Sequence, residues 1–229
     1  MKTISAIAML AIAMLCAPTM AQENTAEDWY KKGIELYHQE SFKEALDAFN
    51  HLLEMNPQYF DAWLYKGAAF DMIAITSSGK EGLEVFEESL KAYDKAIEIN
   101  PQNATAWMFK GGALDNIAHG MAYNFKMAWP SKDPIGFFNQ SIQAFDKALE
   151  LNPESASAWH GKGVALIHLG RYEESQNLGT AEEITGVYDE ALKAINRAIE
   201  IDPNTPGAQE NKASLLEIMG RHEDALKTA

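Results

Sequence analysis

AWLYKGAAF at residues 62–70 and AYDKAIEINP at residues 92–101 are the two halves of a pattern that recurs along the chain. The first half has further copies: DWYKKGIEL (28–36), AWMFKGGAL (106–114) and AWHGKGVAL (158–166). The second half also has further copies: AFNHLLEMNP (48–57), AFDKALELNP (144–153) and AINRAIEIDP (194–203). Such self-similarity is typical of a repeat array, in which each unit buries its apolar face by stacking on its neighbours.

Each copy places a tryptophan four residues before a glycine and closes on an Asn-Pro or Asp-Pro pair. The positions are Trp29, Trp63, Trp107 and Trp159; Gly33, Gly67, Gly111 and Gly163; and Pro57, Pro101, Pro153 and Pro203. Residues four apart share one face of a helix, so the glycine predicts a slot for a closely packed second helix, beside which the indole fills space. Proline then ends the second helix. The pattern therefore predicts pairs of antiparallel helices.

These positions resemble the tetratricopeptide repeat, a helix-turn-helix unit of about 34 residues. Residues 26–59 have that length, and the family's key places are occupied by Trp29, Gly33, Leu36, Ala45, Phe49 and Pro57. The resemblance implies an all-α solenoid of antiparallel helix pairs with a concave surface that binds a protein or peptide. The expected units are 26–59, 60–103, 104–155, 156–205 and a partial unit 206–229, in which Ala213, Leu216, Gly220 and Ala225 keep the spacing.

Units two to four are longer than the basic repeat. They carry 10, 18 and 16 additional residues, all between the first and second helix, which predicts lengthened hairpins along one edge of the array. Unit two is expected to extend both helices around residues 76–79, and unit three to break at residues 130–134. In unit four two segments have the residue pattern with which a second helix usually begins. They are RYEES (171–175) and, sixteen residues later, VYDEA (187–191).

The third unit's addition carries aromatic and methionine residues that have no place in the basic repeat. They are Met121, Tyr123, Phe125, Met127 and Trp129. Two interpretations stay open: packing in an added core layer, or an exposed apolar patch at the hairpin edge that captures a partner. A metal site built from His119 and two of these methionines is disfavoured, because soft-ligand sites need more converging sulfur and nitrogen atoms.

The family resemblance also indicates which first-helix residues line the concave groove. They are Tyr30, Leu64, Met108 and His160; Ile34, Ala68, Gly112 and Val164; and Tyr37, Asp71, Asp115 and Ile167. The central column is small and apolar, and Asp71 and Asp115 lie to one side, which suits a segment bearing apolar side chains and a Lys or Arg. The alternative is that both aspartates are solvated helix-face residues. The Lys and Asn pair with which some relatives clamp a terminal carboxylate is missing.

A lysine stands directly before each of the repeated glycines, and again in the partial unit. These residues are Lys32, Lys66, Lys110, Lys162 and Lys212. One interpretation is a basic ladder that binds a partner. The sequence favours the other interpretation, in which each stem lies over a neighbouring residue and each head group pairs with an acid.

The N-terminus has the layout of a secretory signal. One lysine precedes an apolar run (4–15), which is followed by Pro18 and small residues up to Ala21. The run is short for a membrane span, so we expect cleavage after Ala21 and export to the periplasm, cell surface or medium, with an uncleaved anchor as the alternative. Cys16 is the chain's one cysteine, and the large Leu15 before it argues against a lipid anchor. The mature chain, 22–229, would then lack disulfides and thiol chemistry.

Charge and motif content limit the classes of function. With 19 Lys+Arg against 33 Asp+Glu the net charge is −14, which disfavours nucleic acid and anionic membranes as partners. The sequence has no phosphate-binding glycine loop, no His-Glu-x-x-His motif and no ligand spacing among its six histidines, so no catalytic residue, cofactor or metal is expected. The expected function is a non-enzymatic adaptor outside the cytoplasm. The alternative is a self-associating envelope scaffold, because the partial fifth unit leaves an apolar C-terminal face.

Overall fold

A computed structural model describes residues 25–77, 79–124 and 133–226 of the chain. Within these residues all regular structure is helical. The helices, in chain order, are α2 (Ala26–His38), α3 (Phe42–Met55), α4 (Phe60–Thr76), α5 (Gly79–Ile99), α6 (Ala104–His119), the π-helical η1 (Gly120–Asn124), α7 (Pro134–Leu151), α8 (Ala156–Gln176), α9 (Ala181–Ile201), α10 (Ala208–Ile218) and α11 (His222–Leu226). The predicted all-α solenoid is confirmed.

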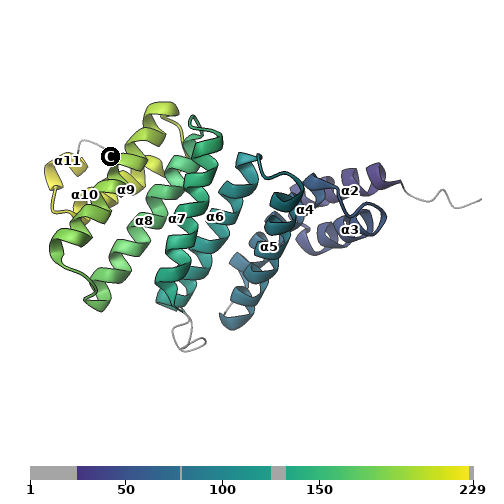
Figure 1. Ribbon diagram of the computed structural model, residues 1–229, viewed down its shortest axis with the longest axis horizontal. Coiled ribbons are helices and arrows are strands. Elements are labelled where there is room, and N and C mark those ends of the chain that lie inside the picture. Colours follow the sequence, from purple (N-terminus) through teal and green to yellow (C-terminus); the bar gives the residue numbers. More distant parts are fainter. Residues whose placement is uncertain (1–24, 78, 125–132, 227–229) are drawn as a thin grey trace, which may run out of the picture.

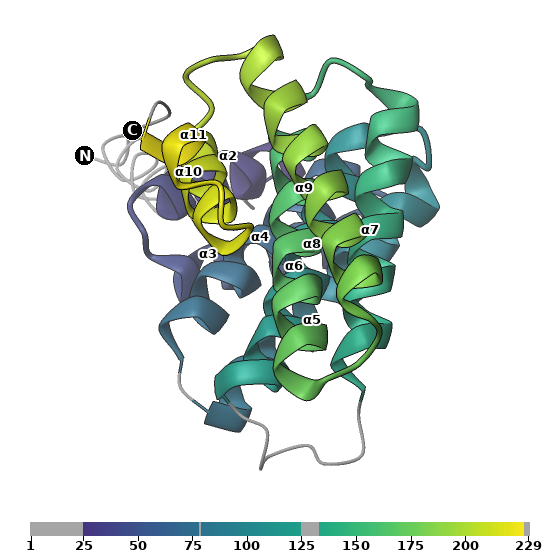
Figure 2. The ribbon, with the colours of Figure 1, turned by 90° about the vertical axis from the view of Figure 1, so that its left-hand side faces the viewer.

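The helix pairs follow one another along the long axis, from α2 and α3 at one end to α10 and α11 at the other (Figure 1). Each helix packs on the next helix of the chain, and the first helices also contact one another, α2 with α4, α4 with α6, α6 with α8 and α8 with α10. Close approach of successive first helices places them on the inner side of a curved array, as the end-on view shows (Figure 2).

Inside each hairpin the repeated glycine accommodates the second helix. A Cβ atom added at Gly33 would lie 2.5 Å from the ring of Phe49, and one at Gly67 would lie 2.4 Å from the ring of Tyr93. At Gly163 the same atom would lie 2.6 Å from Ile195. Such distances are shorter than van der Waals contact, so the glycine slot inferred from the sequence is present.

Between hairpins the tryptophan makes a contact that the sequence pattern did not predict. The indole Nε1–H of Trp63 donates a hydrogen bond of 2.8 Å to the carbonyl oxygen of Pro57, which closes the preceding unit. Trp107 bonds Pro101 at 3.0 Å and Trp159 bonds Pro153 at 2.8 Å in the same way. The tryptophan therefore joins each unit to the turn before it, besides filling space.

The lengthened hairpins have the predicted location. The first pair, α2 and α3, has helices of 13 and 14 residues, whereas both helices of the fourth pair, α8 and α9, have 21. RYEES continues α8 and does not open a second helix. The helix ends at Asn177, whose φ of 52° is left-handed, and α9 begins after a capping box formed by Thr180 and Glu183.

The partial fifth unit is folded onto the fourth. Leu215 and Leu216 are buried against Ile195 and Leu192 of α9, and Ala225 of α11 completes this cluster. Leu226, at the end of α11, is 78 % exposed. The described part of this unit thus covers the face of unit four and leaves an apolar side chain at the outer end.

Candidate partner-binding groove

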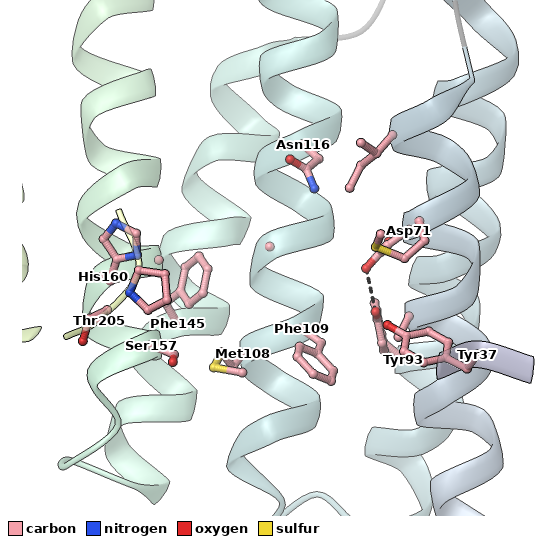
Figure 3. A pocket seen from close by; sticks show the side chains of 16 residues that line it. Tyr37, Asp71, Tyr93, Met108, Phe109, Asn116, Phe145, Ser157, His160 and Thr205 are labelled. Atoms are coloured by element: carbon pink, nitrogen blue, oxygen red, sulfur yellow. Dashed lines mark hydrogen bonds between the residues drawn. The ribbon is translucent and has the colours of Figure 1, made fainter. Parts of the chain in front are cut away.

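The first helices enclose a cavity of about 500 Å³ on the concave side of the array (Figure 3). Half of the groove residues predicted from the sequence line it: Tyr37, Ala68, Asp71, Met108, Gly112 and His160. The structure therefore brings together residues from four successive units, α2, α4, α6 and α8, in one depression.

Small residues on the first helices make this depression deep enough to reach the second helices. Nothing lies within 4 Å of a Cβ atom placed on Gly112, so this glycine faces open space. Gly161 lies so close to the ring of Phe145 that an added Cβ atom would be 2.4 Å away. Phe145 of α7 and Tyr93 of α5 therefore line the cavity behind the first helices, beside Phe109 of α6.

Asp71 supplies a carboxylate to this largely apolar wall. Its Oδ2 accepts a hydrogen bond of 2.6 Å from the hydroxyl of Tyr93, as Figure 3 shows, whereas its buried Oδ1 has no hydrogen-bond partner among the described residues. Burial raises the pKa of the Asp71 carboxyl to about 6, and the hydroxyls of Ser89 and Tyr93 limit the rise. Since the Ser89 hydroxyl donates to the carbonyl of Phe86 at 2.8 Å, Tyr93 is the partner that the geometry supports.

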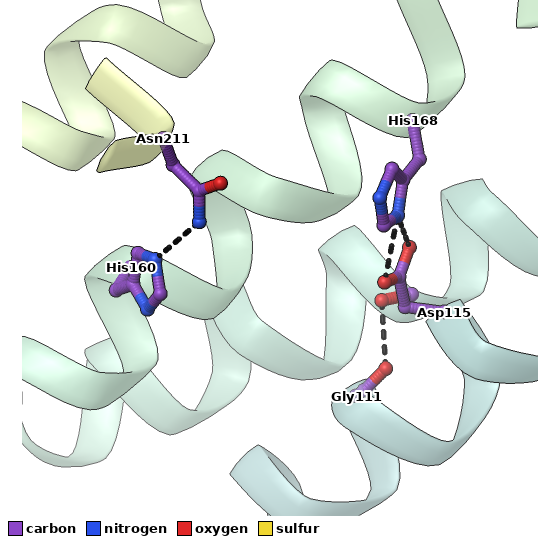
Figure 4. A network of polar contacts seen from close by, with 6 residues as sticks. Gly111, Asp115, His160, His168 and Asn211 are labelled. Atoms are coloured by element: carbon purple, nitrogen blue, oxygen red, sulfur yellow. Dashed lines mark hydrogen bonds and ion pairs between the residues drawn. The ribbon is translucent and has the colours of Figure 1, made fainter. Parts of the chain in front are cut away.

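Asp115 does not line the groove as the sequence suggested. It is 7 % exposed, and both carboxylate oxygens lie 3.0 to 3.1 Å from Nδ1 of His168 on α8 (Figure 4). The expectation that Asp115 faces a partner's Lys or Arg, or solvent, is therefore corrected: it packs between α6 and α8. The cause is the histidine on the neighbouring first helix, which the family's column pattern does not include.

The other predicted groove residues lie outside this cavity. Tyr30 and Ile34 pack against the Phe49 cluster of the first unit, and Leu64 is buried beside Tyr93. Ile167 is buried in the cluster between units four and five. Val164 on α8 is half-buried and does not line the cavity.

The C-terminal end of the groove is closed by the turn between α9 and α10. Thr205 and Pro206 line the cavity there. His160 Nε2 lies 2.9 Å from the side-chain amide of Asn211 on α10, which holds the imidazole against the fifth unit (Figure 4). Burial lowers the pKa of His160.

Two residues of the predicted hairpin-edge patch are described, and they differ. Met121 is 3 % exposed and packs with Leu83, Phe86 and Ile117, which agrees with the added core layer. Tyr123 is 43 % exposed and its ring lies 4.9 Å from that of His119. Phe125, Met127 and Trp129 lie outside the described residues, as do the signal segment 1–21 and Cys16.

Three of the repeated lysines make contacts that serve the fold. Lys110 Nζ lies 2.6 Å from Asp94, and Lys162 Nζ lies 2.8 Å from both Asp146 and Glu190. Lys66 Nζ lies 4.9 Å from the ring centre of Trp63, a cation–π contact. These contacts agree with the structural interpretation of the lysine row.

Several cavity residues were missed in the sequence. They are Met72, Ile75, Tyr93, Phe109, Asn116, Phe145, Ser157, Gly161, Thr205 and Pro206. The column pattern assigns the groove to three first-helix positions per unit and gives no place to second-helix aromatics. The Gly-Gly pair at 111–112 and Gly161 carried a usable signal, because glycine in a helix interior costs about 1 kcal/mol relative to alanine and marks a close approach.

No three His, Cys, Asp or Glu side chains of the described residues come together as a metal ion would require. None of the described helices is both long enough and apolar enough to cross a membrane.

Family models place recognised repeats along much of the chain. Models described as tetratricopeptide repeat match residues 30–72, 144–177 and 175–205. A model described as protein prenyltransferase alpha subunit repeat matches residues 86–117, from α5 into α6. The matches at 86–117 and 144–177 each run from the second helix of one expected unit into the first helix of the next, whereas the match at 175–205 covers the second helix of unit four.

Solved structures share the fold at low sequence identity. TTC0263, a thermophilic TPR protein of Thermus thermophilus, is 18 % identical with a TM-score of 0.62, and the alignment covers 89 % of this chain and 88 % of that one. MamA residues 41 to the end from Desulfovibrio magneticus RS-1 is 14 % identical with a TM-score of 0.61, covering 89 % and 90 %. YrrB, described as a TPR protein with an unusual peptide-binding site, is 17 % identical with a TM-score of 0.56, covering 96 % and 87 %.

One curated relative matches over a shorter stretch. Uncharacterized protein MJ0572 of Methanocaldococcus jannaschii is 38 % identical over 56 residues, which is 24 % of this chain. The alignment spans 65 % of that protein's length.

Proposed function

The chain is a tetratricopeptide-repeat protein, and from this premise we propose that it is a non-enzymatic adaptor that holds a peptide segment of another protein in its concave groove. TPR neighbours of this fold imply a role in protein–protein interaction. YrrB is described as having a peptide-binding site, which supports a peptide as the ligand of the present groove.

The observation that carries this proposal is the cavity itself. It has about 500 Å³, is walled by Met108, Phe109 and Phe145, and has open space in front of Gly112. An apolar side chain of a bound segment would fill this space and remove its wall from water, at about 25 cal/mol for each Å² of apolar surface buried. Because Asp71 Oδ1 has no partner within the part of the chain that the structure describes, a donor on the bound segment would find an acceptor there once the carboxyl turns toward it.

We propose further that the protein works outside the cytoplasm. The support is the sequence of residues 1–21, with a lysine, an apolar run and a small-residue end at Ala21. Expression of the full chain with mass spectrometry of the exported product tests this proposal. A mature N-terminus at Gln22 is expected, whereas an intact chain beginning at Met1 in the cytoplasm would contradict export.

Two glycines provide a matched test of the groove. Gly112 faces the groove and Gly186 lies outside it on α9, and nothing lies within 4 Å of a Cβ atom at either position. Gly112→Trp is expected to fill the cavity without disturbing the helix, while Gly186→Trp adds the same side chain elsewhere.

The experiment uses residues 22–229 as bait with extracts of the native envelope, and partners are identified by mass spectrometry. A partner that recurs with the wild type and Gly186→Trp and is lost with Gly112→Trp is the expected result. Equal recovery with both variants would exclude the groove as the binding site.

A self-associating scaffold is the second candidate, and the C-terminal end favours it. Leu226 is 78 % exposed at the end of the described array, in the same unit as the partly buried Ile218 and Met219. Sedimentation velocity of residues 22–229 at tens of micromolar distinguishes the two candidates. A concentration-dependent assembly that Leu226→Glu dissolves would support the scaffold, and a monomer would support the adaptor.

A further inference from the structure

A second, smaller cavity lies where the lengthened first helices of units three and four run side by side. It has about 80 Å³ and is lined by His119, Tyr123, His168 and Arg171. In the basic unit the first helix ends at His38, nine residues after Trp29. His119, Tyr123 and Arg171 all lie further than nine residues beyond the tryptophan of their own unit, so the additional residues build this cavity.

Most of these side chains are held in place by their neighbours. The buried Asp115 carboxylate accepts a hydrogen bond of 3.0 Å from Nδ1 of His168, which fixes the orientation of the imidazole ring (Figure 4). The other ring nitrogen of His168, Nε2, does not contact Asp115. The rings of His119 and His168 lie 4.5 Å apart, and the ring of Tyr123 lies 4.9 Å from His119. Tyr123 belongs to η1, and π-helical turns frequently occur at functional sites.

The cavity is cationic in a protein that is strongly anionic overall. Arg197 and Arg221 each form ion pairs, whereas Arg171 has no ion pair with any carboxylate of the described residues. The nearby acids have other partners, since Asp115 is bound to His168 and Glu174 accepts from the Tyr188 hydroxyl at 3.0 Å. Burial lowers the pKa of His119, and so do the neighbouring charges of His168 and Arg171, against the effect of Asp115.

The small cavity and the partner-binding groove are linked by neighbouring cavities that share lining residues. An intermediate cavity of about 170 Å³ shares Ile75 and Asn116 with the groove and shares His119 with the small cavity. Ile75, which lines both the groove and the intermediate cavity, is 60 % exposed and is therefore available to a bound segment. An apolar site and a cationic one therefore lie near each other on the first helices.

We propose that the cavity formed by His119, Tyr123, His168 and Arg171 is a subsite for an Asp or Glu carboxylate of a peptide whose apolar side chain occupies the groove. This inference rests on the proposed function. A guanidinium binds a planar carboxylate through two parallel N–H···O bonds, and an imidazole N–H and a phenol hydroxyl provide further donors. The net charge of −14 disfavours a more highly charged oxyanion such as phosphate.

The probe is a library of random decapeptides with acetylated N-termini and amidated C-termini, so that Asp and Glu carry its only carboxylates. The library is selected on residues 22–229 of the wild type and of Arg171→Gln. Arg221→Gln is the matched control, because Arg221 is a surface arginine on the far end of the array, paired with Asp224. Both substitutions change exposed side chains, and circular dichroism checks that both variants stay folded.

Peptides selected by the wild type are expected to carry an acidic residue at a fixed distance from an apolar one. Replacing that residue by its amide, or introducing Arg171→Gln, should weaken binding about tenfold, which corresponds to one charge-assisted hydrogen bond. Arg221→Gln should leave the affinity unchanged. A second library with free C-terminal carboxylates shows whether a chain terminus serves equally well.

The outcomes separate this inference from the proposed function. Binders without acidic enrichment, or acidic binders with equal affinity for Arg171→Gln, would overturn the subsite, and the groove function would stand if Gly112→Trp still abolished their binding. A library that yields no binder at all would overturn the groove function, and with it the subsite.

Discussion

At the scale of single residues, glycines at neighbouring positions of the repeat have opposite structural roles. Gly67 contacts the ring of Tyr93, which is itself held by Asp71, whereas Gly112 faces open space. A helical glycine costs about 1 kcal/mol relative to alanine, and overpacking costs about 1–3 kcal/mol. Replacing glycine by alanine is therefore expected to destabilise the protein at Gly67 and to stabilise it at Gly112.

We therefore expect Gly67→Ala to lower the free energy of unfolding by about 1–2 kcal/mol, because Tyr93 has no room to move away. Gly112→Ala should raise the free energy of unfolding by up to about 1 kcal/mol. Urea denaturation followed by circular dichroism measures both. Equal changes at the two sites would contradict the packing described for Gly67.

Asp71 gives the protein a stability that depends on pH. Its carboxyl has a pKa raised to about 6 by burial, against an ordinary value of 3.8, so the folded state holds the proton more tightly than the unfolded state. This contribution is fully present below the ordinary pKa and is lost as the pH rises through about 6. The loss amounts to about 3 kcal/mol, because a difference of one between the folded and unfolded pKa values corresponds to about 1.4 kcal/mol.

Asp71→Asn keeps an acceptor for Tyr93 and removes the titration. The variant is expected to be about 3 kcal/mol more stable than the wild type at about pH 8 and equally stable at about pH 4. Urea denaturation at the two pH values tests this prediction. A stability difference that does not change with pH would show that Asp71 is not the titrating group.

The sequence predicted residue positions best where one local rule determines them. The repeated glycines and prolines have the roles assigned to them, because a missing side chain or a missing amide hydrogen acts on the residue's immediate neighbours. Asp115 was placed wrongly, since its environment depends on His168, which is 53 residues away on another helix. Phe145 was missed in the groove because its exposure there depends on glycines of two different units.

At the scale of secondary-structure elements, the length of each hairpin was predictable and its turn was not. The added residues counted in the sequence reappear as longer helices on both sides of the turn, most plainly in α8 and α9. RYEES was ambiguous because its apolar and acidic spacing suits the end of a first helix as well as the start of a second. The turn was decided by Asn177, which adopts a left-handed φ, and by the capping box that follows it.

The cap at Thr180 should contribute measurably to α9. Its hydroxyl accepts from the Glu183 amide at 3.2 Å, while the Glu183 carboxylate accepts from the Thr180 amide at 2.6 Å. Thr180→Ala is expected to cost about 1 kcal/mol in unfolding free energy, whereas Thr185→Ala, in the exposed first part of the same helix, should cost nothing measurable. Thermal denaturation of the two variants provides the comparison, and equal midpoints would refute the cap's contribution.

At the scale of the whole molecule, stability is expected to vary along the array. Within the described residues units two to four each pack on a unit at both sides, whereas the first and fifth units each pack on one described neighbour. The fifth unit consists of the short α10 and α11, and its buried cluster depends on contact with α9. The central units pack on both sides through long helices.

Native-state hydrogen exchange should therefore show lower protection in α10 and α11 than in α6 to α9, with opening that does not require global unfolding. Mass spectrometry of peptide fragments resolves the difference. Uniform protection along the chain would indicate one cooperative unit and contradict nearest-neighbour stabilisation. Leu215→Ala should widen the difference, because it removes a fully buried contact between the fifth unit and the fourth.

The indole bonds to the proline carbonyls have a mechanical consequence. Trp63, Trp107 and Trp159 clamp the turns between units, all at one rim of the array, while the long hairpin tips at the opposite rim carry no equivalent clamp in the described residues. A change in the curvature of the array is therefore expected to displace the hairpin tips more than the hydrogen-bonded turns. Small changes in curvature would alter the gap between His119 and Arg171 more than the spacing of the clamped turns.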